Sequence, residues 1–253
     1  MKRSLLIVVL FSILYPLTEF ESESQELWKI RRYEAVAGLG PSFFFGDVGG
    51  YSRSKNILGI RDLTFLQTRF NLNFNLKYRI TKDINARLSL TYGLLHATDI
   101  RGSNENRNFE ASISIFEPAL IGEYYFIKNE AEKSYLFTKG RGSGLRNFMS
   151  SLDFYAFAGI GGLNYSVKGN DKLVAHGYNN GGFTAVIPLG IGTTLVYSPD
   201  FNFGIELGGR YSFSDYLDGY TSQYSSANDV YYFLNFTFTY KIKNGPKGWP
   251  SFR

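Results

Sequence analysis

The residues with the clearest capacity for acid–base chemistry are the two histidines, His96 and His176. His96 is followed shortly by Asp99, and a histidine beside an aspartate or a serine can act as the base of a hydrolase. Neither histidine belongs to a longer pattern, and an isolated histidine is more often structural than catalytic. We therefore predict no catalytic residue and no enzyme, and keep a hydrolase based on His96 as the weakest alternative.

Sequence motifs for cofactors are also missing. The chain has no cysteine, and no group of histidines and carboxylates has the spacing of a metal site. Two glycine runs, Gly38-Leu39-Gly40 and Gly159-Ile160-Gly161-Gly162, do not complete a phosphate-binding fingerprint. We expect no metal and no cofactor, and we expect these glycines to allow close packing of strands.

A further set of candidate residues is charged and lies within long segments in which polar and apolar residues alternate. In residues 63–80, most even positions are apolar and most odd positions are polar or charged. Successive side chains of a β-strand point to opposite faces, so such a segment has one apolar wall and one polar wall. The charged residues on the polar wall are Arg69, Lys77, Arg87, Glu117, Glu123, Glu206, Arg210 and Lys241.

The same alternation predicts eight strands. It is clear in residues 63–80, 84–94, 201–214 and 230–242. It is weaker in residues 33–45 and 152–167, where we expect glycine and alanine on the inner face, and in residues 183–197. In residues 109–126 the apolar positions change phase near Glu117-Pro118, which predicts a β-bulge at that point.

These strands favour a transmembrane barrel over a soluble sandwich. A sandwich points its apolar faces at each other, whereas outer-membrane barrels turn the apolar face to lipid and the polar face inward. The strands are long, their polar wall carries Arg, Lys and Glu, and residues 1–24 have the basic start and apolar core of a signal peptide. The net charge of +5 is spread along the chain, so no nucleic-acid partner is expected. We therefore predict an all-β, eight-stranded antiparallel transmembrane β-barrel in the cell outer membrane.

The lengths of the connections predict how the barrel is oriented, because such barrels have short periplasmic turns and longer outer loops. Residues 81–83 and 198–200 are short turns, whereas 46–62, 98–108, 168–181 and 215–228 are longer. This predicts a periplasmic segment at 25–32, a barrel at 33–242 and a periplasmic tail at 243–253. The connection 127–150 is then periplasmic and unusually long.

An eight-stranded barrel is only wide enough for its own side chains to fill. The inward charges named above must therefore pair, because an unpaired buried ion costs several kcal/mol. Glu206 and Arg210 lie too far apart along their strand to pair with each other, so we expect each to pair with a neighbouring strand. A structural plug of salt bridges is the preferred interpretation, and a conduction or proton path is the alternative.

Two stretches resemble a known family. Residues 43–50, FFFGDVGG, resemble the opening motif of PorG-like outer-membrane barrels, and residues 203–219, FGIELGGRYSFSDYLDG, resemble that family's penultimate strand and following loop. The resemblance implies a component of the type IX protein secretion machinery that associates with periplasmic ring proteins. It carries over no catalytic residue. The matching residues in the outer loops are Gly46, Asp47, Asp215, Asp218 and Gly219, and they serve either a tight loop fold, which we favour, or a partner contact.

If the barrel is an anchor of this kind, its partner surface should be periplasmic. The candidate contacts there are Lys133, Lys139 and Arg141 in the long connection and Trp249 in the tail. The other interpretation of these residues is a solvated cationic segment near the membrane. For the whole chain, the alternative to an anchor is a generic OmpA- or OmpX-like barrel whose outer loops bind surface ligands.

Overall fold

The computed structural model describes residues 31–49, 67–100, 106–129, 134–138, 144–221, 228–245 and 249–251. The expected signal peptide, most of the segment 25–32, and the candidate contacts Lys133, Lys139 and Arg141 lie outside the described residues.

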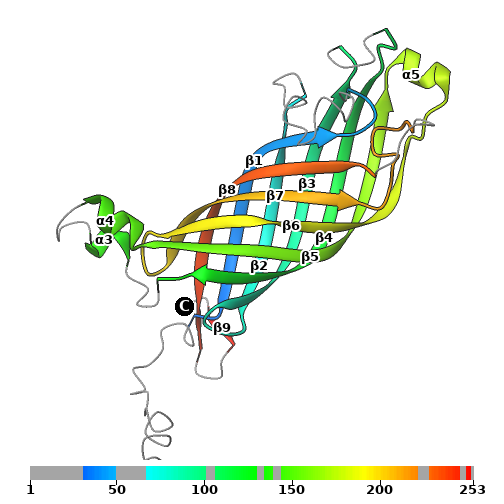
Figure 1. The fold of residues 1–253 in the computed structure, drawn as a ribbon. Coiled ribbons are helices and arrows are strands. Elements are labelled where there is room, and N and C mark those ends of the chain that lie inside the picture. Colours follow the sequence, from blue (N-terminus) through cyan, green and yellow to red (C-terminus); the bar gives the residue numbers. More distant parts are fainter. Residues whose placement is uncertain are drawn as a thin grey trace, which may run out of the picture.

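The chain folds into a closed antiparallel β-barrel (Figure 1). Each strand from β1 to β8 pairs with the next one in sequence, and β1 also pairs with β8, so the eight strands close on themselves. This confirms the predicted fold class. The strands are β1 (Tyr33–Phe45), β2 (Arg69–Arg79), β3 (Ile84–Thr98), β4 (Glu110–Ile127), β5 (Leu152–Gly169), β6 (Gly181–Val196), β7 (Phe201–Ser212) and β8 (Val230–Asn244).

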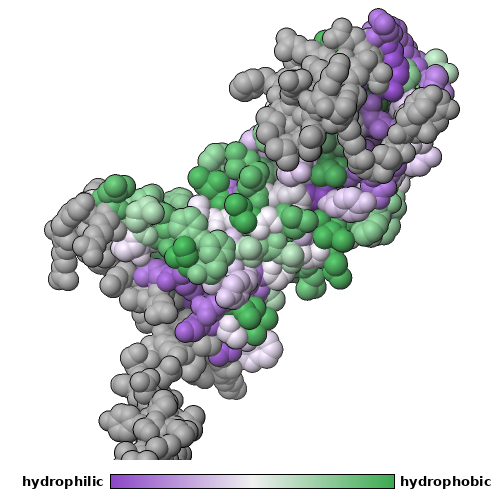
Figure 2. All heavy atoms as spheres, in the orientation of Figure 1, coloured by the Kyte–Doolittle hydropathy of each residue, from purple (hydrophilic) through white to green (hydrophobic). Residues whose placement is uncertain are grey.

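Alternation of exposed and buried residues along the strands separates the two walls of the barrel. In β8, Phe236 is 53% exposed, whereas the next residue, Thr237, is 6% exposed and faces the interior. Apolar side chains spread over the middle of the outer wall (Figure 2). A wide apolar wall on the outside of a closed barrel is the arrangement that lipid contact requires.

The seam between β1 and β8 depends on a close approach of two backbones. A Cβ atom at Gly40 would collide with the backbone carbonyl oxygen of Leu234. No side chain fits there, so glycine at position 40 lets the last strand approach the first and close the barrel.

The expected bulge in β4 does not exist. Every odd residue from Ala111 to Tyr125 faces the interior, and β4 keeps one continuous register with β3 past Glu117 and Pro118. The described register shift in β4 lies between Tyr125 and Ile127. The apolar positions change phase because Ile113 and Ile115 pack inside the barrel, where its interior is apolar, and do not face lipid. The change of phase therefore needs no bulge.

The inner face of β1 and β5 also differs from the expectation. Glycines do face inward, at Gly38 and Gly40 in β1 and at Gly159 and Gly161 in β5. The alanines of both strands face outward instead, and β5 contributes large rings to the interior, Tyr155 and Phe157 among them. The small inner residues make room for these rings and for the long charged side chains across the barrel.

Short helices lie at the two ends of the barrel. α5 (Asp171–His176) lies in the connection between β5 and β6, at one end. α3 (Tyr135–Thr138) and α4 (Gly144–Met149) lie at the opposite end, in the long connection between β4 and β5. The short strand β9 (Pro250–Ser251) pairs with β8 at the same end (Figure 1). No helix in the described ranges is long and apolar enough to cross a membrane.

Candidate functional site

Four charged side chains from four strands meet in the barrel interior. Lys77 lies 2.8 Å from Glu123, and Arg87 lies 3.1 Å from Glu123 and 2.7 Å from Glu206. All four are buried, and two cations balance two carboxylates. We call Lys77, Arg87, Glu123 and Glu206 the central ion network.

Neutral groups add hydrogen bonds to both carboxylates of this network. Tyr155 donates its hydroxyl to Glu206 at 2.6 Å, and Tyr125 and Asn85 donate to Glu123 at 3.2 and 3.3 Å. A buried carboxylate is tolerated when several donors surround it. Sequence reasoning missed the two tyrosines, although both occupy inward positions of the polar–apolar alternation.

A second ion pair lies on the side of the network toward α5. The guanidinium of Arg210 lies 3.5 Å from Glu117, and its carbon lies 4.5 Å from the centre of the Phe233 ring. Tyr231 donates its hydroxyl to the other oxygen of Glu117. Glu206 and Arg210 therefore pair with other strands and not with each other.

The remaining interior charges lie toward the two ends. Arg79 pairs with Glu34 at 3.2 Å, and both are buried, an ion pair that sequence reasoning did not single out. Lys241 is buried opposite Glu34 in the register of β1 and β8. Arg69 is only half-buried and lies at the end of β2 nearest α5.

Beyond these charges, the interior at the α5 end is apolar. Phe44, Leu95, Ile113, Leu163 and Phe233 belong to one buried cluster that extends into the loops through Val48, Leu173 and Leu217. Sequence reasoning expected a polar interior throughout. The apolar layer fills the lumen at the α5 end, and the charged layers fill the rest of it with side chains. This filling can hold the barrel rigid, but it is poorly suited to conduct water or ions.

The motif residues of the two loops meet above the apolar layer. Asp218 is buried and accepts hydrogen bonds from the backbone N–H of Val48 at 2.8 Å and of Tyr220 at 3.0 Å. Gly46 lies against it, because a Cβ atom there would lie 2.7 Å from an Asp218 oxygen. Gly219 has a φ of 80°, a conformation that favours glycine.

The other two motif residues belong to the same loop pair. Asp215 accepts a hydrogen bond from the Thr221 hydroxyl, and the carbonyl of Asp47 accepts one from Arg107 at 2.8 Å. Asp218 and Gly46 thus connect the β1–β2 loop to the β7–β8 loop, whereas Asp215 acts within its own loop and Asp47 contacts the β3–β4 loop. This geometry fits a loop-folding role for them.

Asp99, which the sequence paired with His96, serves another purpose. It forms an ion pair with Arg107 at 2.7 Å and accepts hydrogen bonds from the backbone N–H groups of Gly49 and Phe109. Arg107 in turn lies over the rings of Phe109 and Tyr220. Asp99 therefore helps to hold three loops together.

His96 contacts two residues of β4 instead. Its Nδ1 lies 3.3 Å from the hydroxyl of Ser112, and its Nε2 lies 3.5 Å from a carboxylate oxygen of Glu110. Sequence reasoning missed these neighbours, because they are brought together only by the pairing of β3 with β4.

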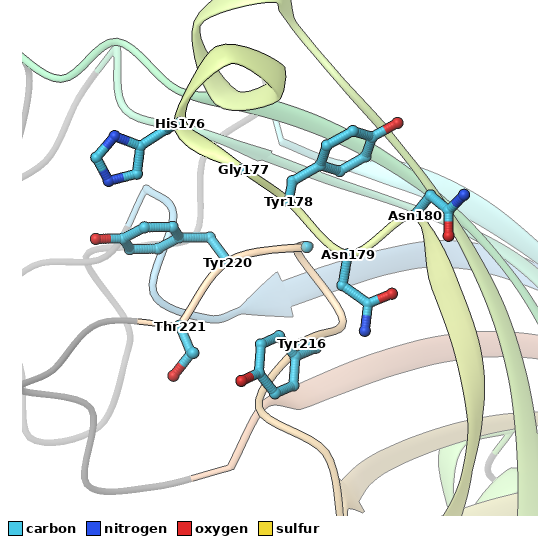
Figure 3. A pocket seen from close by; sticks show the side chains of 9 residues that line it. His176, Gly177, Tyr178, Asn179, Asn180, Tyr216, Tyr220 and Thr221 are labelled. Carbon is cyan, nitrogen blue, oxygen red and sulfur yellow. The ribbon is translucent and has the colours of Figure 1, made fainter.

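The loops at this end also line an open cavity of about 790 Å³. The rings of His176, Tyr216 and Tyr220 and the polar side chains of Asn179 and Thr221 surround it (Figure 3). His176 and Tyr220 are in contact, with ring centres 5.8 Å apart. Rings and amides around a concave surface are suited to binding a small polar ligand.

The two buried aspartates make the loop pair sensitive to pH. Burial raises the pKa of Asp218 to about 7, an effect to which Asp47 and Asp215 add and which the backbone N–H groups of Val48 and Tyr220 oppose. Burial and the neighbouring Asp218 raise the pKa of Asp229 well above its ordinary value. Because the folded pKa of Asp218 exceeds 3.8, its ordinary value, protonation favours the folded loops, and their stability falls as the pH rises through about 7.

We therefore expect the amides of Val48 and Tyr220 to exchange with solvent more readily at pH 8 than at pH 5, after correction for the intrinsic rates. The Asp218→Asn variant should show a smaller difference, because an asparagine side chain stays neutral at both pH values. Hydrogen exchange followed by mass spectrometry measures both proteins. Equal protection of the wild type at the two pH values would contradict the prediction.

At the opposite end, the structure describes one of the four candidate partner contacts. Trp249 is 72% exposed, next to β9. In the same part of the molecule, Leu145 of α4 is 74% exposed, and Phe148 of α4 packs its ring against Tyr135 of α3. Among the described residues, no group of three or more His, Asp or Glu side chains could hold a metal ion.

Comparison with known proteins found similar solved structures, all of low sequence identity. No family model matches the chain, and no curated protein matches it. One similar solved structure is Neisserial surface protein A, with 11% identity over 83% of this chain and 96% of that chain and a TM-score of 0.44. Ail of Yersinia pestis has 12% identity over 84% of this chain and 99% of that chain, with a TM-score of 0.40. Outer membrane protein W of E. coli has 15% identity over 84% of this chain and 98% of that chain, with a TM-score of 0.38. The closed strand order and the apolar outer wall define the chain as an eight-stranded barrel of the outer-membrane class.

Proposed function

We propose that this chain is a structural barrel that anchors a protein secretion complex of type IX in the outer membrane. The observation that carries the proposal is the filled interior. Because ion pairs and apolar side chains occupy the lumen, the barrel is better suited to present the surfaces at its ends to a partner than to conduct a substrate. An anchoring role needs a rigid barrel and an exposed partner surface, and it needs no catalysis.

Two further features support an anchoring role. The residues that resemble the PorG-like motifs hold the loops of β1–β2 and β7–β8 together, so this end of the barrel has the rigid form that an anchor needs. The end that carries α3, α4 and β9 offers exposed apolar and aromatic side chains, Leu145 and Trp249, outside the barrel wall. Exposed aromatic residues of this kind are enriched at protein interfaces.

A co-purification experiment tests the proposal. In a cell that uses this secretion system, an affinity-tagged chain is expected to retain periplasmic ring proteins after detergent extraction. Deletion of residues 245–253, or replacement of Lys133, Lys139 and Arg141 by Glu, should reduce both co-purification and secretion while the barrel stays folded. Shortening of the loop 168–181 at the opposite end is the matched control and should change neither.

A second candidate function is ligand binding through the outer loops, as in a generic OmpA- or OmpX-like barrel. The cavity beside His176 and Tyr220 favours it. The same experiment separates the two, because only this second function is lost when the loop 168–181 is shortened. If that change abolishes function while the changes at the other end are silent, the anchoring proposal is wrong.

A further inference from the structure

The outer wall of the barrel is polar where β3, β4 and β5 approach the α5 end. His96, Ser112 and Lys168 are neighbours in the registers of these three strands and share the outward face. Ser112 and Lys168 are exposed, whereas the His96 ring is buried against its neighbours. This polar group marks the end of the apolar outer wall on these three strands.

The contacts within this group match those of a hydrolase that uses a serine nucleophile. One ring nitrogen of His96 lies 3.3 Å from the hydroxyl of Ser112, and the other lies 3.5 Å from the carboxylate of Glu110. A nucleophile within reach of a base, with an acidic group that orients the base, is the general signature of nucleophilic catalysis. The charged groups that act on His96 are Glu110 and Arg69.

The position of Ser112 along the barrel indicates a substrate. Large exposed rings lie below the site on three strands: Phe70 on β2, beside the Asn71–Gly93 pair, then Tyr92 on β3, four residues from His96, and Phe116 on β4, four residues from Ser112. At about 3.3 Å per residue, Ser112 lies about 13 Å along β4 beyond Phe116. Aromatic girdles mark the edge of the hydrocarbon layer, so Ser112 lies at the level of lipid head groups and of the ester bonds just beneath them.

We propose that Ser112, His96 and Glu110 form a hydrolytic site for acyl esters of lipids in the outer leaflet. The inference is separate from the anchoring function and requires only that the α5 end faces outward. Ser112 and His96 are the catalytic residues, and Glu110 is a positioning residue that acts through His96. Lys168, which is paired with Ser112 across β4 and β5, supplies a positive charge beside the reacting carbonyl.

The reaction consumes one water molecule for each ester bond. The Ser112 oxygen attacks the ester carbonyl while His96 takes its proton, and the lipid alkoxide leaves with that proton as an acyl-serine forms. Water then attacks the acyl-serine, gives a proton to His96, and releases a fatty acid. The proton returns to Ser112, so the enzyme ends as it began.

The test uses the full mature protein in detergent micelles. A fluorophosphonate probe should label Ser112. The protein should also release fatty acid from a diacyl phospholipid or from an acylated glucosamine lipid. Comparing the two lipids shows which of them supplies the ester. Ser112→Ala should abolish labelling and release, and His96→Gln should slow both by at least about 100-fold. Ser114→Ala, on the same face two residues further along β4, is the matched control and should behave as the wild type.

Three further measurements keep the outcome clear. Each variant should keep the gel mobility of a folded barrel before boiling. Glu110→Gln should lower kcat while KM is unchanged, and Glu110→Asp should restore part of the loss, which a purely structural contact would not produce. A folded wild-type protein that is not labelled, is labelled at another serine, or is labelled at Ser112 without releasing fatty acid from either lipid would overturn the proposal.

Discussion

Replacement of Arg87 by leucine is expected to lower the free energy of unfolding of the barrel by about 3–5 kcal/mol, the cost of removing one member of a buried ion network. Arg87 contacts Glu123 at 3.1 Å and Glu206 at 2.7 Å, whereas Lys77 lies 3.9 Å from Glu206. Without it, two buried carboxylates share Lys77 alone. Urea unfolding in lipid vesicles, followed by the shift in gel mobility between folded and unfolded barrel, measures the change.

Two comparisons test the cause of this effect. The double variant Arg87→Leu with Glu206→Leu removes one charge of each sign and leaves Lys77 paired with Glu123 at 2.8 Å, so it should be more stable than Arg87→Leu alone. Arg31→Met breaks the more exposed Arg31–Asp200 pair and should cost less than about 1 kcal/mol. If Arg87→Leu costs no more than Arg31→Met, the central ion network does not stabilise the barrel.

The second large effect is expected on the outer wall. Phe236→Arg should cost about 2–4 kcal/mol when position 236 lies near the bilayer midplane, because an arginine there meets hydrocarbon. The same unfolding measurement applies. A fluorophore attached at position 236 should report lipid, and one attached at position 237 should not, because Phe236 is exposed and Thr237 is buried.

Phe236→Leu is the matched control, since it keeps an apolar side chain on the lipid face and should be mild. A lipid signal from position 237, or equal costs for arginine and leucine at position 236, would show that the last strand faces the other way. A shift of the strand by one residue reverses every side chain, so this single site tests the register of β8 as a whole.

The interior and the loops explain why the sequence-based predictions failed where they did. Alternation reports which side of a strand a residue occupies, but not what surrounds it. Ile113 and Ile115 appeared to face lipid because they are apolar, whereas they pack inside against Leu95 and Phe233. A barrel whose lumen is polar in one layer and apolar in the next gives β4 two apparent phases without any bulge.

The site residues show the same division. The charges Lys77, Arg87, Glu123 and Glu206 were identified as inward from their positions in the alternation, because burial of one face follows from a period of two. Their partners were not identified, because pairing depends on the stagger between strands, and the two tyrosines that bind the carboxylates lie on β4 and β5. Ser112 and His96 are distant in sequence, and only the β3–β4 register makes them neighbours.

The sequence by itself determined that this chain is a membrane barrel, how many strands it has and which face of most strands meets lipid. These properties follow from local alternation and from the number of segments that carry it. Tertiary structure alone decided which partners the interior charges have, that the two motif loops are joined through Asp218, and that Ser112, His96 and Glu110 lie together. The physical reason is that strand order, stagger and closure bring together residues that local pattern cannot relate, and buried charges and hydrogen-bonding groups acquire their partners only then.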